Sequence, residues 1–153
     1  GSSDRRIVPG AALRSAGVDV TLTGRAECFI VGRPDLDETL RRLTAYSEAG
    51  ADCLYAPGIR TREQIIAVVG AAAPKPVNVL MGAPSEFTVA DLAALGVRRI
   101  SVGASLARAA WGGFIRAAKA LHDGRFDGFA DAASGAELGK LFRDDAAKRR
   151  EAP

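Results

Sequence analysis

Apolar and polar positions along the chain follow two repeat lengths, one typical of strands and one typical of helices. Short β-branched or apolar runs predict strands at 18–23, 53–56, 76–81 and 97–102. Between the first two strands, apolar residues within 36–46 recur at steps of three and four, which indicates an amphipathic helix. Similar but shorter patterns follow the second and third strands. The pattern therefore predicts four strand–helix units.

The signature of a helix start precedes three of the predicted helices. The residue pairs that carry it are Asp35 with Glu38, Thr61 with Gln64, and Thr88 with Asp91. In such a pair, the first side chain accepts a hydrogen bond from the backbone N–H three residues on. Further amphipathic patterns predict a helix from 105 to about 122 and a terminal helix from about 135 to 150. Residues 9–17 read as the last turns of an earlier helix closed by glycine.

Strands that alternate with helices predict an α/β fold of parallel strands joined by right-handed crossovers. Alternation alone fits an open sheet as well as part of a barrel, but no glycine-rich phosphate loop supports a nucleotide-binding sheet. Residues 18–122 form the four units, which would make half of a (β/α)₈ TIM-type barrel. Residues 1–17 are interpreted as a tag scar followed by the remnant of a preceding helix, and 123–153 as a connection and an amphipathic tail.

Composition narrows the class of protein. Of the 153 residues, 48% are hydrophobic and 25% charged, which is ordinary for a globular protein. The net charge of +3 is small and no basic stripe with interleaved aromatics occurs, so we expect no nucleic-acid partner. No apolar run reaches membrane-spanning length, and no signal peptide is evident, so we expect no membrane partner. Cys28 and Cys53 lack metal-ligand spacing and read as reduced, buried thiols of a cytoplasmic protein.

Candidate chemistry gathers at or near the strand ends, which face one side in a parallel sheet. The residues found there are Arg25, Glu27, Tyr55, Asn78, Ser101 and Ser105. The planar fork of Arg25 suits a carboxylate or phosphonate, but pairing with Glu27 is an equally good interpretation. Asn78 is either a buried amide or a ligand contact. Ser105 could help bind an anion at a helix start, although an ordinary helix cap is favoured. His122, the only histidine, reads as a surface residue near a helix end.

Four segments of the chain together resemble the isocitrate lyase/phosphoenolpyruvate mutase superfamily. The first, 23–29, is similar to that family's strand end with a central arginine, although Gly24 replaces the usual alanine. The second, 36–52, is similar to the helix that follows it. Residues 75–82 and 95–103 continue the resemblance in order.

The resemblance implies a fold and an activity. Family members are (β/α)₈ barrels that bind Mg²⁺ and act on small 2-oxo or hydroxy acids and phosphonates, making, breaking or rearranging C–C or P–C bonds through enolate intermediates. The four units would then be the second half of the barrel, and Arg25 would grip the anionic substrate, with Glu27, Asn78 and Ser105 beside it. Members also exchange their last barrel helix between subunits, which implies a homo-oligomer in which the 105–122 helix is swapped.

Several features depart from the family pattern. Pro57-Gly58 stands where lyases of the family carry a glutamate, and Leu80-Met81-Gly82 replaces an Asn-x-Thr pattern, which favours the mutase-like or uncharacterised branch. The family's metal-binding acids lie on earlier strands, so we expect this chain alone to bind no Mg²⁺ and to be inactive. The alternative is a non-catalytic barrel fragment that functions by association.

A half barrel also predicts an exposed inner face. We expect that face to carry four apolar side chains and to drive self-association. The residues expected there are Leu22, Leu54, Val79 and Ile100.

Overall fold

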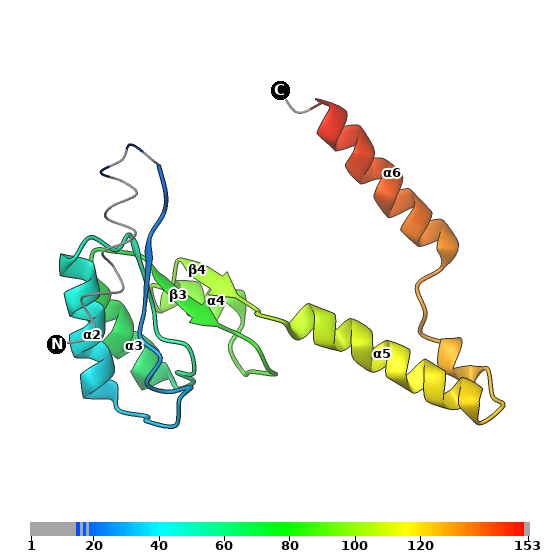
Figure 1. Ribbon diagram of the computed structural model, residues 1–153, viewed down its shortest axis with the longest axis horizontal. Coiled ribbons are helices and arrows are strands. Elements are labelled where there is room, and N and C mark those ends of the chain that lie inside the picture. The colour runs from blue at the N-terminus through cyan, green and yellow to red at the C-terminus, as the bar shows by residue number, and fades with distance from the viewer. Residues whose placement is uncertain (1–14, 16, 18, 152–153) are drawn as a thin grey trace. The chain divides into compact units, whose positions relative to one another are not determined.

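The computed structural model describes residues 15, 17 and 19–151 (Figure 1). The chain divides into two compact units, one ending at Ser105 and one beginning at Leu106. The helix end predicted at 9–17 lies largely outside the described residues.

The first unit is built on a four-stranded sheet whose strands lie in sequence order. The strands are β1 (Thr23–Arg25), β2 (Cys53–Tyr55), β3 (Val77–Leu80) and β4 (Arg99–Ser101). Every neighbouring pair is parallel. The predicted α/β fold of four parallel strands is therefore confirmed, and β1 and β4 form the edges of the sheet in the part of the chain that the structure describes.

The first strand was placed too early by the sequence pattern. The apolar run at 18–23 predicted the strand, but β1 begins at Thr23 and ends at Arg25. Leu22, just before it, donates its backbone N–H to Asp52 Oδ2 at 2.7 Å and accepts from the backbone N–H of Asp52 at 2.8 Å. The aspartate side chain thus binds the N–H of Leu22 in place of a partner strand, and Arg25 is the last residue of the strand.

Three helices of the first unit follow their strands as predicted. They are α2 (Leu36–Glu48), α3 (Arg62–Ala72) and α4 (Val89–Ala94). The side chain of Asp35 caps α2, and complete capping boxes begin α3 at Thr61 and α4 at Thr88. These caps satisfy backbone N–H groups that have no partner inside the helix, which fixes where each helix starts.

The hydrophobic core lies between the sheet and helices α2 and α3, which contact each other. Leu54 and Val79 are both 0% exposed and belong to this core, together with Leu43 of α2 and Ile65 of α3. Leu22 also packs against it. The expectation that Leu22, Leu54, Val79 and Ile100 lie on an exposed inner face is therefore wrong for the first three. Ile100 is 36% exposed, but as the register partner of Val79 it lies on the same face as that core residue.

Strand periodicity explains the correction. Successive side chains of a strand point to opposite faces, so burying Leu54 and Val79 against the helices turns their neighbours to the other face. That second face carries Tyr55 and Asn78. It is mainly polar, although Leu80 and Cys53 also project from it.

The second unit contains most of α5 (Ser105–His122), a short 3₁₀ helix η2 (Asp127–Phe129) and α6 (Gly135–Glu151). The segment with η2 turns back on α5: a Cβ added to Gly128 would lie 2.7 Å from Ala117 Cα and 2.9 Å from Ala120 Cβ. Glycine is therefore required for this close approach. Among the described residues, no helix combines the length and apolar character needed to cross a bilayer.

Candidate anion-binding site

A row of four side chains crosses the polar face of the sheet. The strand register pairs Arg25 with Tyr55, Tyr55 with Asn78, and Asn78 with Arg99. Paired residues of parallel strands project on the same face, so one residue from each strand contributes to this row. Two guanidinium groups lie at the ends of the row, and a phenol and an amide lie between them.

Arg25 is held by contacts on two sides. Its Nε lies 2.6 Å from Glu27 Oε1, and its Cζ lies 5.0 Å from the centroid of the Tyr55 ring. The ion pair uses Nε, whereas the terminal Nη groups have no recorded partner among the described residues. The side chain is 46% exposed, so these groups are accessible to a ligand. The arrangement orients a cation that can still donate two parallel hydrogen bonds to an anion.

The sequence left two interpretations of Arg25 open, an ion pair with Glu27 and an anion-binding group at a strand end. The structure is compatible with both. Arg25 pairs with Glu27, as one interpretation had it, and also projects from the carboxyl end of a strand, as the other required. Since Nε and the Nη groups are separate donors, one guanidinium can satisfy both.

Asn78 is the buried polar group of the row. Its side chain is 0% exposed, and its Nδ2 donates to Ser101 Oγ at 3.0 Å. Its Oδ1 is buried and has no hydrogen-bond partner in the described part of the chain. Asn78 therefore links β3 to the end of β4 and keeps one acceptor unused.

Ser105 lies where the loop after β3 meets the start of α5. Its Oγ donates to the backbone carbonyl of Gly82 at 2.8 Å, and its N–H donates to Val102 O at 3.1 Å. The hydroxyl thus ties two chain segments together at the carboxyl end of the sheet. Ser105 is the first residue of α5 rather than the residue before it.

Cys53 shares a face with Arg25, because it precedes Tyr55 by two residues in β2. Burial raises the pKa of its thiol, which outweighs the lowering effect of the nearby Arg99 guanidinium. A thiol with a raised pKa is mostly protonated at neutral pH and is a poor nucleophile. Cys28 is also free and buried.

The sequence predicted Tyr55 at a strand end with candidate chemistry, but it did not predict Arg99, which begins a strand instead of ending one. Only the register places them in a row with Arg25, and the register is not visible in the sequence.

The sequence matches the phosphoenolpyruvate phosphomutase family over residues 5–122. Oxaloacetate decarboxylase from Bradyrhizobium diazoefficiens is 38% identical over 112 residues, which cover 67% of this chain and 38% of that protein.

Solved structures give the same result. A protein from Burkholderia cenocepacia J2315, provisionally described as a lyase/mutase, superposes with a TM-score of 0.84 and 46% identity over 92% of this chain and 52% of that one. Phosphonopyruvate hydrolase superposes with a TM-score of 0.66 and 29% identity, again over 92% of this chain and 52% of that one. The chain thus spans about half the length of these structures. The resemblance inferred from the sequence is confirmed, and the chain belongs to the phosphoenolpyruvate phosphomutase family.

Proposed function

We propose that the four βα units form half of a (β/α)₈ barrel enzyme that binds small anionic 2-oxo acids, hydroxy acids or phosphonates. The reaction class is C–C or P–C bond chemistry through an enolate. The observation that carries the proposal is the Arg25 guanidinium, oriented by Glu27 and Tyr55 at the carboxyl end of β1. Active sites of (β/α)₈ barrels lie at this end of the strands.

The stagger of the strands supports a barrel rather than a flat sheet. Arg25 is the last residue of β1, yet its row ends at Arg99, the first residue of β4. Strands must tilt and shift along one another in this way for a sheet to close on itself. A closed barrel would also bring the polar face inward and pair the edges at β1 and β4.

The names of the relatives support an anionic substrate. Oxaloacetate decarboxylase and phosphonopyruvate hydrolase are named for small molecules that carry carboxylate or phosphonate groups. A guanidinium with two free Nη groups recognises either kind of oxyanion. In the proposed reaction, Arg25 binds the anionic group and holds the rest of the substrate over the polar face of the sheet.

Family membership implies Mg²⁺, but the described residues do not suit it. No group of three or more His, Cys, Asp or Glu side chains in the described part of the chain could hold a metal ion. Mg²⁺ prefers carboxylate oxygens in octahedral geometry, and Glu27 beside Arg25 supplies only one such group. The contribution proposed for these residues is therefore limited to binding and orienting the substrate, and the chain alone is expected to bind no Mg²⁺.

Calorimetric titration with oxalate and phosphonoacetate tests the anion site. Arg25→Ala should weaken binding of both ligands by about tenfold to a hundredfold, the range expected for losing charge-assisted hydrogen bonds. Arg62→Ala is the matched control, because Arg62 also lies over an aromatic ring, 5.6 Å from the centroid of Phe87, but belongs to α3 and not to the row. Affinities that Arg25→Ala leaves unchanged would refute the site.

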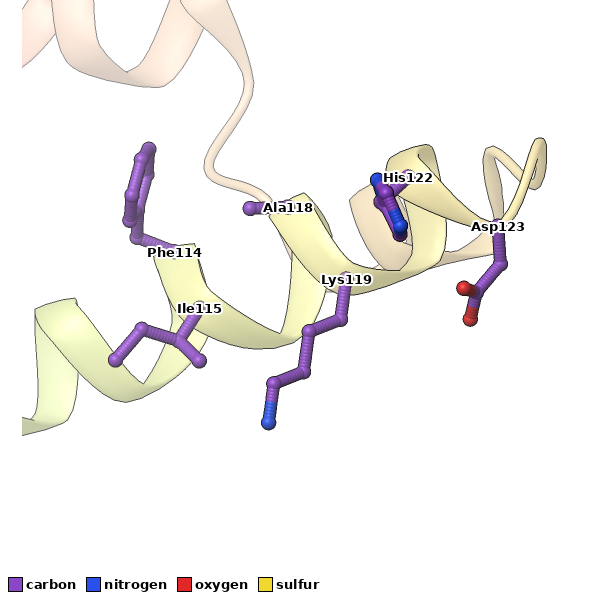
Figure 2. A pocket seen from close by; sticks show the side chains of 6 residues that line it. All are labelled: Phe114, Ile115, Ala118, Lys119, His122 and Asp123. Carbon is purple, nitrogen blue, oxygen red and sulfur yellow. The ribbon is translucent and has the colours of Figure 1, made fainter.

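A second proposal concerns assembly. Helix α5 carries two aromatic side chains, Trp111 and Phe114, each 62% exposed and stacked edge-on with centroids 5.4 Å apart. A pocket lies along the same helix, and Figure 2 shows the side chains that line it. Its lining residues are Phe114, Ile115, Ala118, Lys119, His122 and Asp123.

Large exposed apolar surfaces of this kind commonly mark protein–protein contacts. We propose a homo-oligomer in which α5 is covered by, or exchanged with, a second copy of the chain. If the chain lacks catalysis, this association is its alternative function.

The free, buried Cys28 and Cys53 support a reducing, cytoplasmic location.

A further inference from the structure

Asn78 carries a hydrogen-bond acceptor that the fold buries and does not use. The residue is 0% exposed, and its Oδ1 has no partner among the described residues. Nearly all buried side-chain oxygens are hydrogen-bonded, so an unpaired one requires an explanation. Packing does not supply it, because Asn78 lies on the polar face and its neighbours Val77 and Val79 face the core.

The amide has a defined orientation. Nδ2 donates to Ser101 Oγ at 3.0 Å, which fixes that side of the amide toward β4. With Nδ2 bonded to Ser101, Oδ1 is the atom of the amide that is left for another donor. The residue of β2 that pairs with Asn78 is Tyr55.

Arg25 approaches the same place from the other side. Its guanidinium leans over the Tyr55 ring, at 5.0 Å from Cζ to the ring centroid. The backbones of Arg25 and Asn78 are two strand spacings apart, or about 10 Å. A cationic donor and a neutral acceptor therefore project from the two strands on either side of the strand that carries this ring.

We propose that Asn78 Oδ1 accepts a hydrogen bond from a hydroxyl group of the anion bound by Arg25, so that the site prefers hydroxy acids. The inference rests on the proposed function and names the substrate class for the same site. A hydroxyl can donate to Oδ1, whereas the keto oxygen of an oxo acid and the methylene of a deoxy acid cannot.

Two features make this contact effective. The oxygen has already lost its water in the folded chain, so a donor that reaches it replaces no existing hydrogen bond. Asn78 also shares a face with Arg25 through the intervening Tyr55. Because Asn78 is 0% exposed, a ligand reaches it only when neighbouring side chains move.

The test compares three ligands of equal length and charge. The affinities of malate (each enantiomer), oxaloacetate and succinate for the 153-residue chain are measured by calorimetry. One malate enantiomer should bind about tenfold more tightly than succinate, in line with one hydrogen bond to a buried acceptor, and oxaloacetate should bind like succinate. Asn78→Leu should remove the preference for malate over succinate.

Ser101→Ala provides a second comparison, because it removes the partner of Nδ2 and with it the hydrogen bond that fixes the amide, but keeps Oδ1. It should weaken the preference for malate less than Asn78→Leu does. Equal affinities of the wild-type chain for malate and succinate would overturn the inference whether or not the variants fold. A preference that survives in folded Asn78→Leu would overturn it as well.

The outcomes separate this inference from the proposed function. If succinate binding depends on Arg25 but malate does not bind more tightly, only the role proposed for Asn78 is refuted. Failure to bind any of the three ligands, or binding that Arg25→Ala does not weaken, removes the anion site and the inference with it.

Discussion

Arg25 and Tyr55 are register partners across β1 and β2, and the guanidinium of one lies over the ring of the other, 5.0 Å from Cζ to the centroid. The tyrosine ring is buried in the sheet face, so it forms a fixed surface beneath a partly exposed cation. A guanidinium in this position keeps its planar orientation without giving up its terminal donors. The relationship explains how a three-residue strand can hold a binding group in place.

The tyrosine ring should therefore contribute to anion affinity without touching the anion. Tyr55→Leu should weaken oxalate binding about two- to fivefold, because it removes a cation–π contact of about 0.5–1 kcal/mol. Tyr55→Phe keeps the ring and should bind oxalate like the wild-type chain. Calorimetry on the three proteins decides, and equal loss in Tyr55→Phe and Tyr55→Leu would assign the effect to the hydroxyl instead.

Gly24 should be intolerant of the alanine that is usual at this position in the family. A Cβ there would lie 2.7 Å from Tyr46 Cβ and 3.2 Å from both Ala51 Cβ and Leu54 Cδ2. Atoms so close to the backbone cannot move aside cheaply, so Gly24→Ala should lower the free energy of unfolding by about 1–3 kcal/mol. Urea denaturation measures the change.

The same substitution in helix α3 provides the control. At Gly70, which lies within α3, an added Cβ meets no atom within 4 Å. Alanine also has a higher propensity than glycine for the interior of a helix. Gly70→Ala should therefore raise stability, by up to about 1 kcal/mol. Equal effects at Gly24 and Gly70 would contradict the steric account.

The sequence predicted the helices better than the strands. Each capping pair is local, since Thr61 and Gln64 are three residues apart, and the boxes at Thr61 and Thr88 both form as expected. Strand β1 was misplaced because its start depends on Asp52, thirty residues away, which binds the backbone N–H of Leu22. Long-range contacts of this kind leave no periodic signal.

The face of the sheet was assigned wrongly for a related reason. Leu54 and Val79 are apolar and lie on strands, so either face could have buried them. Which face covers them is decided by where α2 and α3 pack, and one residue of register reverses the assignment. Arg25 could be predicted because strand ends are recognisable, whereas the unused oxygen of Asn78 could be found only in three dimensions.

The cap of α4 should make stability depend on acidic pH. The hydroxyl and backbone N–H of Thr88 donate to Asp91 and lower the pKa of its carboxyl below the ordinary 3.8. A folded-state pKa below the unfolded value adds stability above pH 3.8, and this is lost as the pH falls through the lower, folded-state value. Thr88→Val removes the hydroxyl interaction, so its loss of stability should be greater at pH 6 than at pH 3.

Urea midpoints at the two pH values measure this difference. Asp91→Asn supplies the reference, since it cannot titrate, and the stability cost of Thr88→Val in that background should be the same at pH 6 and pH 3. A pH-dependent cost that persists in the Asp91→Asn background would assign the effect to another carboxyl.

The chain alone should show no turnover of oxo or hydroxy acids, with or without Mg²⁺. The described residues bind and orient an anion but include no group of acidic side chains that could hold the metal. Metal-assisted enolate chemistry needs those ligands next to the developing charge. Assays of oxaloacetate decarboxylation and malate cleavage on homogeneous protein test this, with the uncatalysed rates subtracted. Mg²⁺-dependent turnover that Arg25→Ala abolishes would show that this chain carries a complete site.

Self-association should depend on the aromatic face of α5. Trp111 and Phe114 are each 62% exposed, and burying two large aromatic side chains is worth several kcal/mol to an interface. The double variant Trp111→Gln/Phe114→Gln should therefore shift the chain from dimer or higher oligomer toward monomer, as measured by light scattering at micromolar concentration. Leu141→Gln/Phe142→Gln on α6 is the matched control, since those side chains are equally exposed but lie on another helix. It should leave assembly intact. A wild-type chain that is a compact monomer would contradict the assembly proposal, and association lost only in the α6 variant would move the interface to that helix.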